Sequence, residues 1–143
     1  MLIGEFNHNL DNKGRVIVPS RFREVLQDRF IITYGLDHSL FVYPLEEWSA
    51  LGKKLRSMPF TKAEARAFQR LFFSGAADVE IDKQGRILIP PLLREHAKLN
   101  KEIVFIGVSN RAEIWSRENW NEYSNQVSLS YEQIAEKMID FEF

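Results

Sequence analysis

The sequence predicts an α+β protein in which two tandem copies of one unit pack together about a pseudo-two-fold axis, with helices at the periphery. The first observation is an internal repeat: residues 11–24, DNKGRVIVPSRFRE, return 71 positions later as residues 82–95, DKQGRILIPPLLRE. The second is that each copy alternates short strand patterns with helix patterns. A third is size, because 143 residues with 45% hydrophobic side chains bury roughly two thirds of the unfolded surface.

The repeat extends beyond this segment with a one-residue insertion, so that Gly35 matches Gly107 and Trp48 matches Trp120. One copy has too few strands to cover both faces of its sheet, and we therefore expect the two copies to share a core. The predicted organisation is a first repeat at 1–57, a linking helix at 58–74, a second repeat at 75–127 and a C-terminal helix at 128–143.

Each copy opens with a strand, a turn and a second strand. Apolar and polar residues alternate over 6–10 and 77–81, which is the period of a half-buried strand. Asp11–Gly14 and Asp82–Gly85 are turn sequences, and apolar triplets follow at 16–18 and 87–89. The pattern predicts two local hairpins, each with an arginine at the start of its return strand.

Helices and a second hairpin complete each copy. Ser20 is a candidate N-cap for a helix over 21–27, and Pro91 is a candidate first-turn residue for a helix over 92–98. The remaining predicted elements are the hairpin strands 30–34 with 40–43 and 103–106 with 113–115, and the helices 45–56 and 117–125.

Two helices lie outside the repeat. Thr61–Glu64 has the pattern of a capping box, and the helix that follows ends at Gly75. Ser130 opens a C-terminal helix with Ile134, Met138 and Phe141 at roughly helical spacing. We expect this last helix to dock on its own core, with docking on a neighbouring subunit as the alternative.

The net charge of −1 conceals an asymmetry between the two halves. Residues 1–71 hold 11 basic and 8 acidic side chains, whereas residues 72–143 hold 8 basic and 12 acidic ones. Six of the basic residues lie within 53–70, and seven of the acidic ones lie within 112–143. These stretches are either solvated helix faces or complementary surfaces that meet between subunits.

The sequence carries no sign of catalysis. It contains no cysteine, its three histidines (His8, His38 and His96) are scattered, and no nucleophile elbow, phosphate loop or zinc-binding helix motif occurs. No apolar run is long enough to span a bilayer, and the N-terminus lacks the features of a signal peptide. We expect a soluble cytoplasmic protein that is not an enzyme and needs no cofactor or metal.

The two Asp-x-x-x-Arg turns are the candidate binding site. An exposed ion pair within an ordinary turn explains one such motif, but turn chemistry does not require arginine at the same offset twice. Arginine offers a donor fork that fits a phosphate or a guanine edge, and an aspartate can orient it. The predicted DNA contacts are Arg15, Arg86, Lys13 and Lys83, and the residues that support them are Asp11, Gly14, Asp82 and Gly85.

Two such motifs, each followed by an apolar triplet, a proline and a helix, resemble the MraZ family of bacterial transcriptional regulators, of the AbrB/SpoVT swapped-hairpin class. The resemblance implies a pseudo-dimeric β-barrel, a homo-oligomeric ring, nucleoid association, and repression of its own division and cell-wall operon through direct DNA repeats. Arg21, Arg23 and Arg94 are weaker candidates for DNA or interface contacts, and Leu92 at the position of Arg21 argues against a symmetric role there. Gln84 likewise stands where the first copy has Lys13. The alternative is an AbrB/MazE-like antitoxin or another non-catalytic interaction module.

Overall fold

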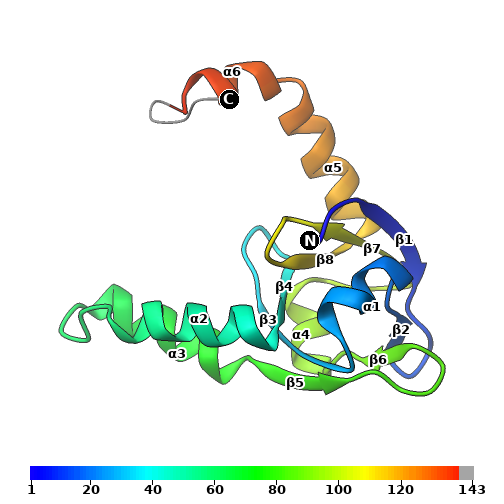
Figure 1. Ribbon diagram of the computed structural model, residues 1–143. Helices are drawn as coiled ribbons and strands as arrows, with labels where there is room; N and C mark the ends of the chain where they lie inside the picture. Colours follow the sequence, from blue (N-terminus) through cyan, green and yellow to red (C-terminus); the bar gives the residue numbers. More distant parts are fainter. Residues whose placement is uncertain (139–143) are drawn as a thin grey trace.

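An antiparallel sheet of six strands forms the body of the protein in the computed structural model, which describes residues 1–138 (Figure 1). The strands in spatial order are β1 (Glu5–Asn9), β7 (Glu102–Gly107), β8 (Ala112–Ser116), β4 (Leu40–Pro44), β3 (Arg29–Tyr34) and β5 (Ala77–Glu80). A separate two-stranded ribbon joins β2 (Arg15–Ile17) to β6 (Arg86–Leu88). The mixed α+β class is therefore confirmed.

The first two strands of each repeat pair with the other repeat. β1 pairs with β7, β5 pairs with β3, and β2 pairs with β6. The prediction that each turn closes a local hairpin ladder is therefore wrong for the described strands. Pairing across the repeats places Val16 and Ile87 side by side in one core, where each is 1% exposed.

The second hairpin of each repeat forms as predicted. β3 pairs with β4, and β7 pairs with β8. β4 and β8 then pair with each other at the middle of the sheet, with Leu40 opposite Ile114. The second hairpins of the two repeats thus join into one sheet, as the shared core required.

Both repeats contribute to the main hydrophobic core, which lies under two short helices, α1 (Ser20–Leu26) and α4 (Pro91–His96). Phe22 of α1 packs edge-on against Phe6 and against Phe105, and Leu93 of α4 is 1% exposed. Pro91 occupies the first turn of α4, as predicted. The core therefore holds both return strands, β2 and β6, through their inward-facing side chains Val16 and Ile87.

Two predicted helix caps are wrong. Ser20 is the first helical residue, because the N-cap is Pro19, whose carbonyl accepts a hydrogen bond from the amide of Phe22. α3 (Ala63–Ser74) has Lys62 as its N-cap and no side-chain cap. Thr61 lies outside the helix, too far back to bond the first-turn amides that a capping box serves. α3 does end at Gly75, as predicted.

Two arms project from the sheet (Figure 1). The α2–α3 arm consists of α2 (Leu45–Arg56), which has its predicted bounds, and α3. The α5–α6 arm consists of α5 (Arg117–Ser128) and α6 (Tyr131–Glu136). α5 is anchored to the sheet by Trp120 and Tyr123, which pack on Trp115.

The prediction that the C-terminal helix docks on its own core is wrong for the described residues. Neither α5 nor α6 contains a buried residue. α5 continues three residues beyond its predicted end at Asn125 and carries α6 away from the sheet. Phe141 lies outside the described residues. Among residues 1–138, no helix has the length and apolar character needed to cross a membrane.

Candidate nucleic-acid interface

Asp11 organises the turn of the first repeat through both of its carboxylate oxygens. Its Oδ1 accepts hydrogen bonds from the amides of Lys13 (2.9 Å) and Arg15 (2.8 Å), and its Oδ2 accepts one from Arg15 Nε (2.8 Å). The backbone closes the same turn, because the amide of Gly14 donates to the carbonyl of Asp11 at 3.0 Å. Gly14 has φ +83°, a conformation that L side chains rarely adopt.

The turn of the second repeat has the same geometry. Asp82 Oδ1 accepts from the amides of Gln84 (2.8 Å) and Arg86 (2.9 Å), and Oδ2 accepts from Arg86 Nε (2.9 Å). Gly85 has φ +79° and donates to the carbonyl of Asp82 at 3.0 Å. The two motifs are therefore copies in structure as well as in sequence.

The hydrogen bonds set the charge state of both turns. Bonds from the Arg15 amide and side chain hold the pKa of Asp11 below its usual value, and the bonds from Arg86 do the same for the pKa of Asp82. Both carboxylates therefore stay ionised at neutral pH, and the ion pairs persist. The side chains are a quarter to two fifths exposed, so these pairs contribute little to stability, and their main effect is to orient the arginines.

Each aspartate engages its arginine only through Nε. Among residues 1–138, no hydrogen bond uses the two terminal nitrogens of either guanidinium. These terminal nitrogens are the pair that forms bidentate contacts with a phosphate or with guanine O6 and N7. Each motif thus holds a donor fork at a fixed angle with its outer end available.

The ribbon brings the two arginines onto one face. In the antiparallel β2–β6 register, Arg15 lies opposite Leu88, and Ile17 lies opposite Arg86. Side chains alternate between faces, and since Val16 and Ile87 point into the core, these four residues share the outer face. Diagonal neighbours in such a pair lie about 7–8 Å apart, which is the relation between Arg15 and Arg86.

Sequence reasoning missed Ile17 and Leu88. Both are about half exposed, at 45% and 53%, although they belong to apolar triplets that read as core. Their signal in the sequence is position, because each stands two residues after its motif arginine and must share that face. The outer face of the ribbon therefore offers two cations and two apolar side chains.

Each turn is supported by the opposite repeat. The carbonyl of Gly14 accepts a hydrogen bond from the amide of Ile89, and that of Gly85 accepts one from the amide of Val18, both at 2.9 Å. A Cβ placed on Gly14 would lie 2.5 Å from Cζ of Arg94, and one placed on Gly85 would lie 2.6 Å from Nη1 of Arg23. The missing side chains therefore let two arginines pack behind the turns.

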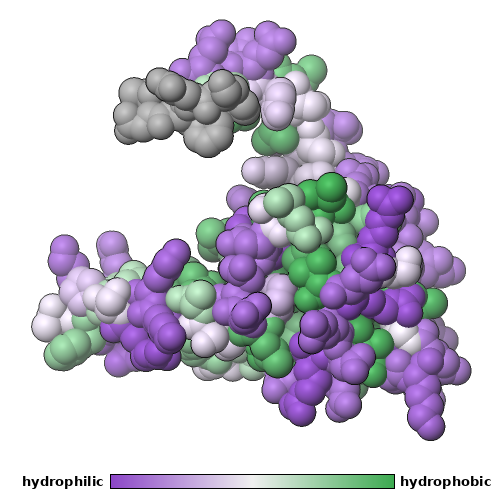
Figure 2. Space-filling model, viewed as in Figure 1, coloured by the Kyte–Doolittle hydropathy of each residue, from purple (hydrophilic) through white to green (hydrophobic). Residues whose placement is uncertain are grey.

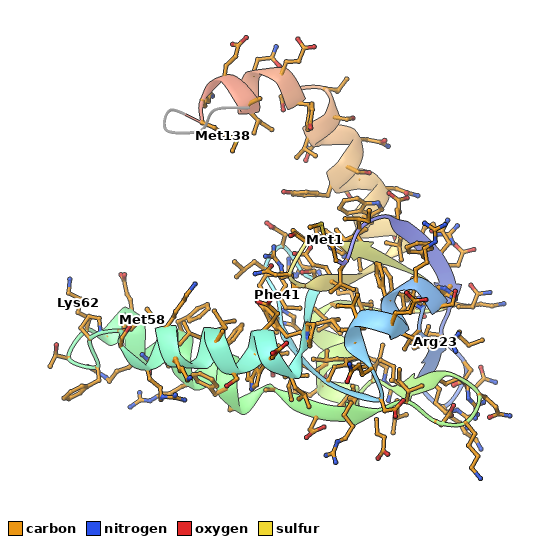
Figure 3. All side chains as sticks on the ribbon, viewed as in Figure 1. Met1, Arg23, Phe41, Met58, Lys62 and Met138 are labelled. Atoms are coloured by element: carbon orange, nitrogen blue, oxygen red, sulfur yellow. The ribbon has the colours of Figure 1, made fainter. Side chains whose placement is uncertain are left out.

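The remaining predicted residues take different places. Arg23, labelled in Figure 3, donates from Nε to the carbonyl of Val18 (3.0 Å). Nε of its counterpart Arg94 is buried and has no hydrogen-bond partner among residues 1–138. Both arginines are half-buried supports behind the ribbon, whereas Arg21 is exposed on α1. Lys13 and Lys83 are exposed in the turns, beside the arginines.

The described part of the chain holds no group of three or more His, Asp or Glu side chains placed to bind a metal ion. The fold and the paired turns define a two-repeat α+β protein with a duplicated basic turn on a shared ribbon. The chain belongs to the MraZ family. The family model, described as "MraZ protein, putative antitoxin-like", matches residues 1–71 and again residues 72–142.

Relatives match the chain over nearly its whole length. A protein of Desulforamulus reducens named transcriptional regulator MraZ is 61% identical over 98% of this chain and 99% of its own length. Proteins of the same name from Moorella thermoacetica and Carboxydothermus hydrogenoformans are 58% and 57% identical, each over 99% of both chains.

Proposed function

We propose that this protein is a transcription regulator that binds double-stranded DNA through the outer face of the β2–β6 ribbon. The observation that carries the proposal is the pair of aspartate-held arginines, Arg15 and Arg86, on that one face. The major groove of B-DNA admits a two-stranded β-ribbon. The name of the relatives described above, transcriptional regulator, supports the regulatory role.

The dimensions and chemistry of the ribbon suit base reading. The diagonal register places the backbone positions of the two arginines about 7–8 Å apart, which corresponds to roughly two base-pair steps of 3.4 Å. Ile17 and Leu88 lie opposite the arginines and offer apolar contacts to thymine methyl groups. Lys13 and Lys83 add phosphate contacts from the turns.

The finer assignment extends the resemblance to the family. On this assignment the chain represses its own division and cell-wall operon by binding direct repeats upstream of it. Each subunit is a pseudo-dimeric, swapped-hairpin barrel, and the subunits form a nucleoid-associated ring. The exchange of strands between the repeats supports the swapped-hairpin description. One subunit offers only two arginine forks, and linked subunits on repeated boxes supply the affinity that one subunit lacks.

The second candidate is an antitoxin-like interaction module. The family description and the exposed α5–α6 arm favour it. Recovery of a stoichiometric toxin partner with the full chain, together with no preference for repeated DNA, would support this candidate over the regulator.

The test measures binding of direct-repeat and scrambled DNA by gel shift with Arg15→Ala, Arg86→Ala and the double variant. Each lost bidentate contact weakens binding by about 1–3 kcal/mol, and the salt dependence of binding is steep because phosphates are neutralised. Arg70→Ala is the matched control, since Arg70 is exposed on α3 and outside the ribbon. Unchanged binding by the double variant refutes the assignment of the ribbon to DNA.

A further inference from the structure

The two arginines behind the turns hold their guanidinium groups in different orientations. A Cβ placed on Gly85 would lie 2.6 Å, 2.9 Å and 3.2 Å from Nη1, Cζ and Nη2 of Arg23. The terminal nitrogens of Arg23 therefore face the second turn, while its Nε donates to the carbonyl of Val18. A Cβ placed on Gly14 would instead meet Cζ, Nη1 and Nε of Arg94, at 2.5 Å, 2.6 Å and 2.9 Å.

A closed set of contacts joins Arg23 to the second turn. The amide of Val18 donates to the carbonyl of Gly85 at 2.9 Å, and the carbonyl of Val18 accepts from Arg23 Nε at 3.0 Å. The other end of the same guanidinium packs against Gly85. Val18 is fully buried, so the carbonyl that anchors Arg23 belongs to the close-packed core and does not move freely.

The first turn has only part of this arrangement. The amide of Ile89 donates to the carbonyl of Gly14 at 2.9 Å, which matches the backbone bond of the second turn. Arg94 is the counterpart of Arg23, but in the portion of the chain that the structure describes, its buried Nε has no hydrogen-bond partner. The backbone bond is therefore present twice, and the side-chain anchor is present once.

The position of Gly85 sets the position of Arg86, the residue that follows it. Arg86 donates from Nε to Asp82 at 2.9 Å, but Asp82 belongs to the same turn, so a shift of the turn would carry both residues together. A binding group keeps its geometry to within about 0.5 Å only when supporting hydrogen bonds and packing hold it. Arg23 supplies such support from outside the turn.

We infer that Arg23 is a positioning residue for DNA recognition by Arg86, the motif arginine of the opposite repeat. The inference rests on the proposed function and deepens it, because it names a residue that acts on one of the two arginine forks. Figure 2 shows mostly hydrophilic surface on the side of the molecule that carries the β2–β6 ribbon. Arg23 is half-buried behind that ribbon and acts on DNA binding through Gly85.

The test is a double-mutant cycle on the affinity of the full chain for direct-repeat DNA. Arg23→Met removes the guanidinium and keeps an unbranched stem. It is expected to weaken binding by about 3–30-fold, which is part of the roughly 5–150-fold that loss of a whole bidentate contact causes. In the Arg86→Ala background the same change is expected to weaken binding by less than about twofold, whereas in the Arg15→Ala background it keeps its full effect.

The free protein provides a measurement that does not depend on DNA. In ¹⁵N relaxation experiments, Arg23→Met is expected to lower the order parameters of the amide and of Nε–H of Arg86 and to leave those of Arg15 unchanged. The amide of Val18, which donates to the carbonyl of Gly85, is expected to exchange its hydrogen faster in the same variant.

The matched control is Arg94→Met, which changes the counterpart of Arg23 behind the first turn. It is expected to show no coupling to Arg86→Ala. Coupling as large as that of Arg23→Met would indicate a general effect on the ribbon and would overturn the inference. Circular dichroism checks the fold of every variant, and Arg23→Lys replaces Arg23→Met in the cycle if the latter does not fold.

Arg23→Lys also separates positioning from a direct phosphate contact. Lysine keeps the positive charge but lacks the planar fork of arginine, so this variant is expected to weaken binding as Arg23→Met does. The slope of log affinity against log salt is expected to keep its wild-type value in both variants. A direct phosphate contact would lower the slope by about one in Arg23→Met and leave it unchanged in Arg23→Lys, and this result would overturn the inference.

Two further results would overturn it. One is an effect of Arg23→Met on affinity that is absent, or that is equal in the Arg86→Ala and Arg15→Ala backgrounds. The other is an unchanged order of Arg86 in the free variant. Failure of the proposed function gives a different result, because Arg15→Ala and Arg86→Ala would then leave DNA binding unchanged, while the relaxation data would still report whether Arg23 holds the second turn.

Discussion

The two repeats agree at their turns and differ at their first helices. Each of the five hydrogen bonds described at the first turn differs in length by at most 0.1 Å from its counterpart at the second. In contrast, α1 exposes Arg21 where α4 exposes Leu92. The duplicated element is the one that meets DNA in the proposed function. The element that differs lies outside the ribbon, where the first repeat exposes a cation and the second an apolar side chain.

A second difference lies behind the turns. Arg23 has a hydrogen bond from Nε to the carbonyl of Val18, whereas within the described part of the chain Arg94 Nε is buried without a partner. The turn of the second repeat, which Arg23 supports, is therefore backed by a fixed side chain. The turn of the first repeat is backed by a guanidinium with one bond fewer.

The largest expected effect comes from making the second repeat like the first. Leu92 lines an apolar groove between α3 and α4, and Leu92→Arg places a cation in it. If this groove is a contact between linked subunits, binding to DNA with several boxes weakens by about 10²–10⁴-fold through lost avidity. Binding to a single box stays unchanged. Gel shifts on one-box and multi-box DNA measure both.

The reciprocal change, Arg21→Leu, is the control for this prediction. It lies on the other side of the pseudo-two-fold axis and is expected to leave the assembly mass at its wild-type value. Equal loss of avidity in both variants would contradict the assignment of the groove to one side.

An intermediate effect, on the free energy of unfolding, distinguishes Arg94 behind the first turn from Arg23 behind the second. Gly14→Ala and Gly85→Ala each impose a side chain on a positive φ, which costs about 1–2 kcal/mol of unfolding free energy. Gly85→Ala also displaces Arg23, which loses its bond to Val18, and is expected to cost about 0.5–1.5 kcal/mol more. Urea denaturation measures the difference.

Gly52→Ala is the control for these two variants. Its nearest neighbour would be 3.7 Å away and it lies within α2, so the added methyl group is expected to stabilise the helix by up to about 1 kcal/mol. Equal destabilisation by Gly14→Ala and Gly85→Ala would show that the Arg23 bond contributes nothing to its turn.

The smallest effect tests the one charge difference at the turns' third position. Lys13→Gln and Gln84→Lys exchange the side chains of the two repeats. If Lys13 contacts phosphate, the slope of log affinity against log salt falls by about one per DNA-contacting turn in the first variant and rises by about one in the second. Unaltered slopes in both would remove Lys13 from the interface.

Local chemistry was sufficient to predict the motifs and most elements. Asp11 and Asp82 precede glycines at a spacing that only a tight turn explains, and α2 begins and ends where its pattern predicts. Strand pairing was not predictable in this way, because Val16 reads as core whether its strand pairs within its repeat or across to the other.

The predictions of two helix caps and of the docking of the last helix were wrong for related reasons. A proline at position 19 took the cap role that Ser20 could also have filled, and sequence patterns do not decide between neighbouring cap residues. Tyr131 and Ile134 indicate that α6 has an apolar face, but the pattern does not indicate whether that face meets its own chain or another. The exposure of Ile17 and Leu88 on the outer face was not predicted, because the sequence of an apolar triplet does not indicate which of its residues is exposed.

The exchange of strands between the repeats also constrains how the chain is made. β1 is synthesised almost at the start, yet its partner β7 begins at Glu102. When only the first half of the chain has left the ribosome, the β3–β4 hairpin is the one strand pair whose two strands are both present. β1 and β2 then have exposed, unpaired edges, because their partners β7 and β6 are not yet synthesised. The sheet therefore closes late, when most of the chain has been translated, and neither half holds a complete sheet by itself.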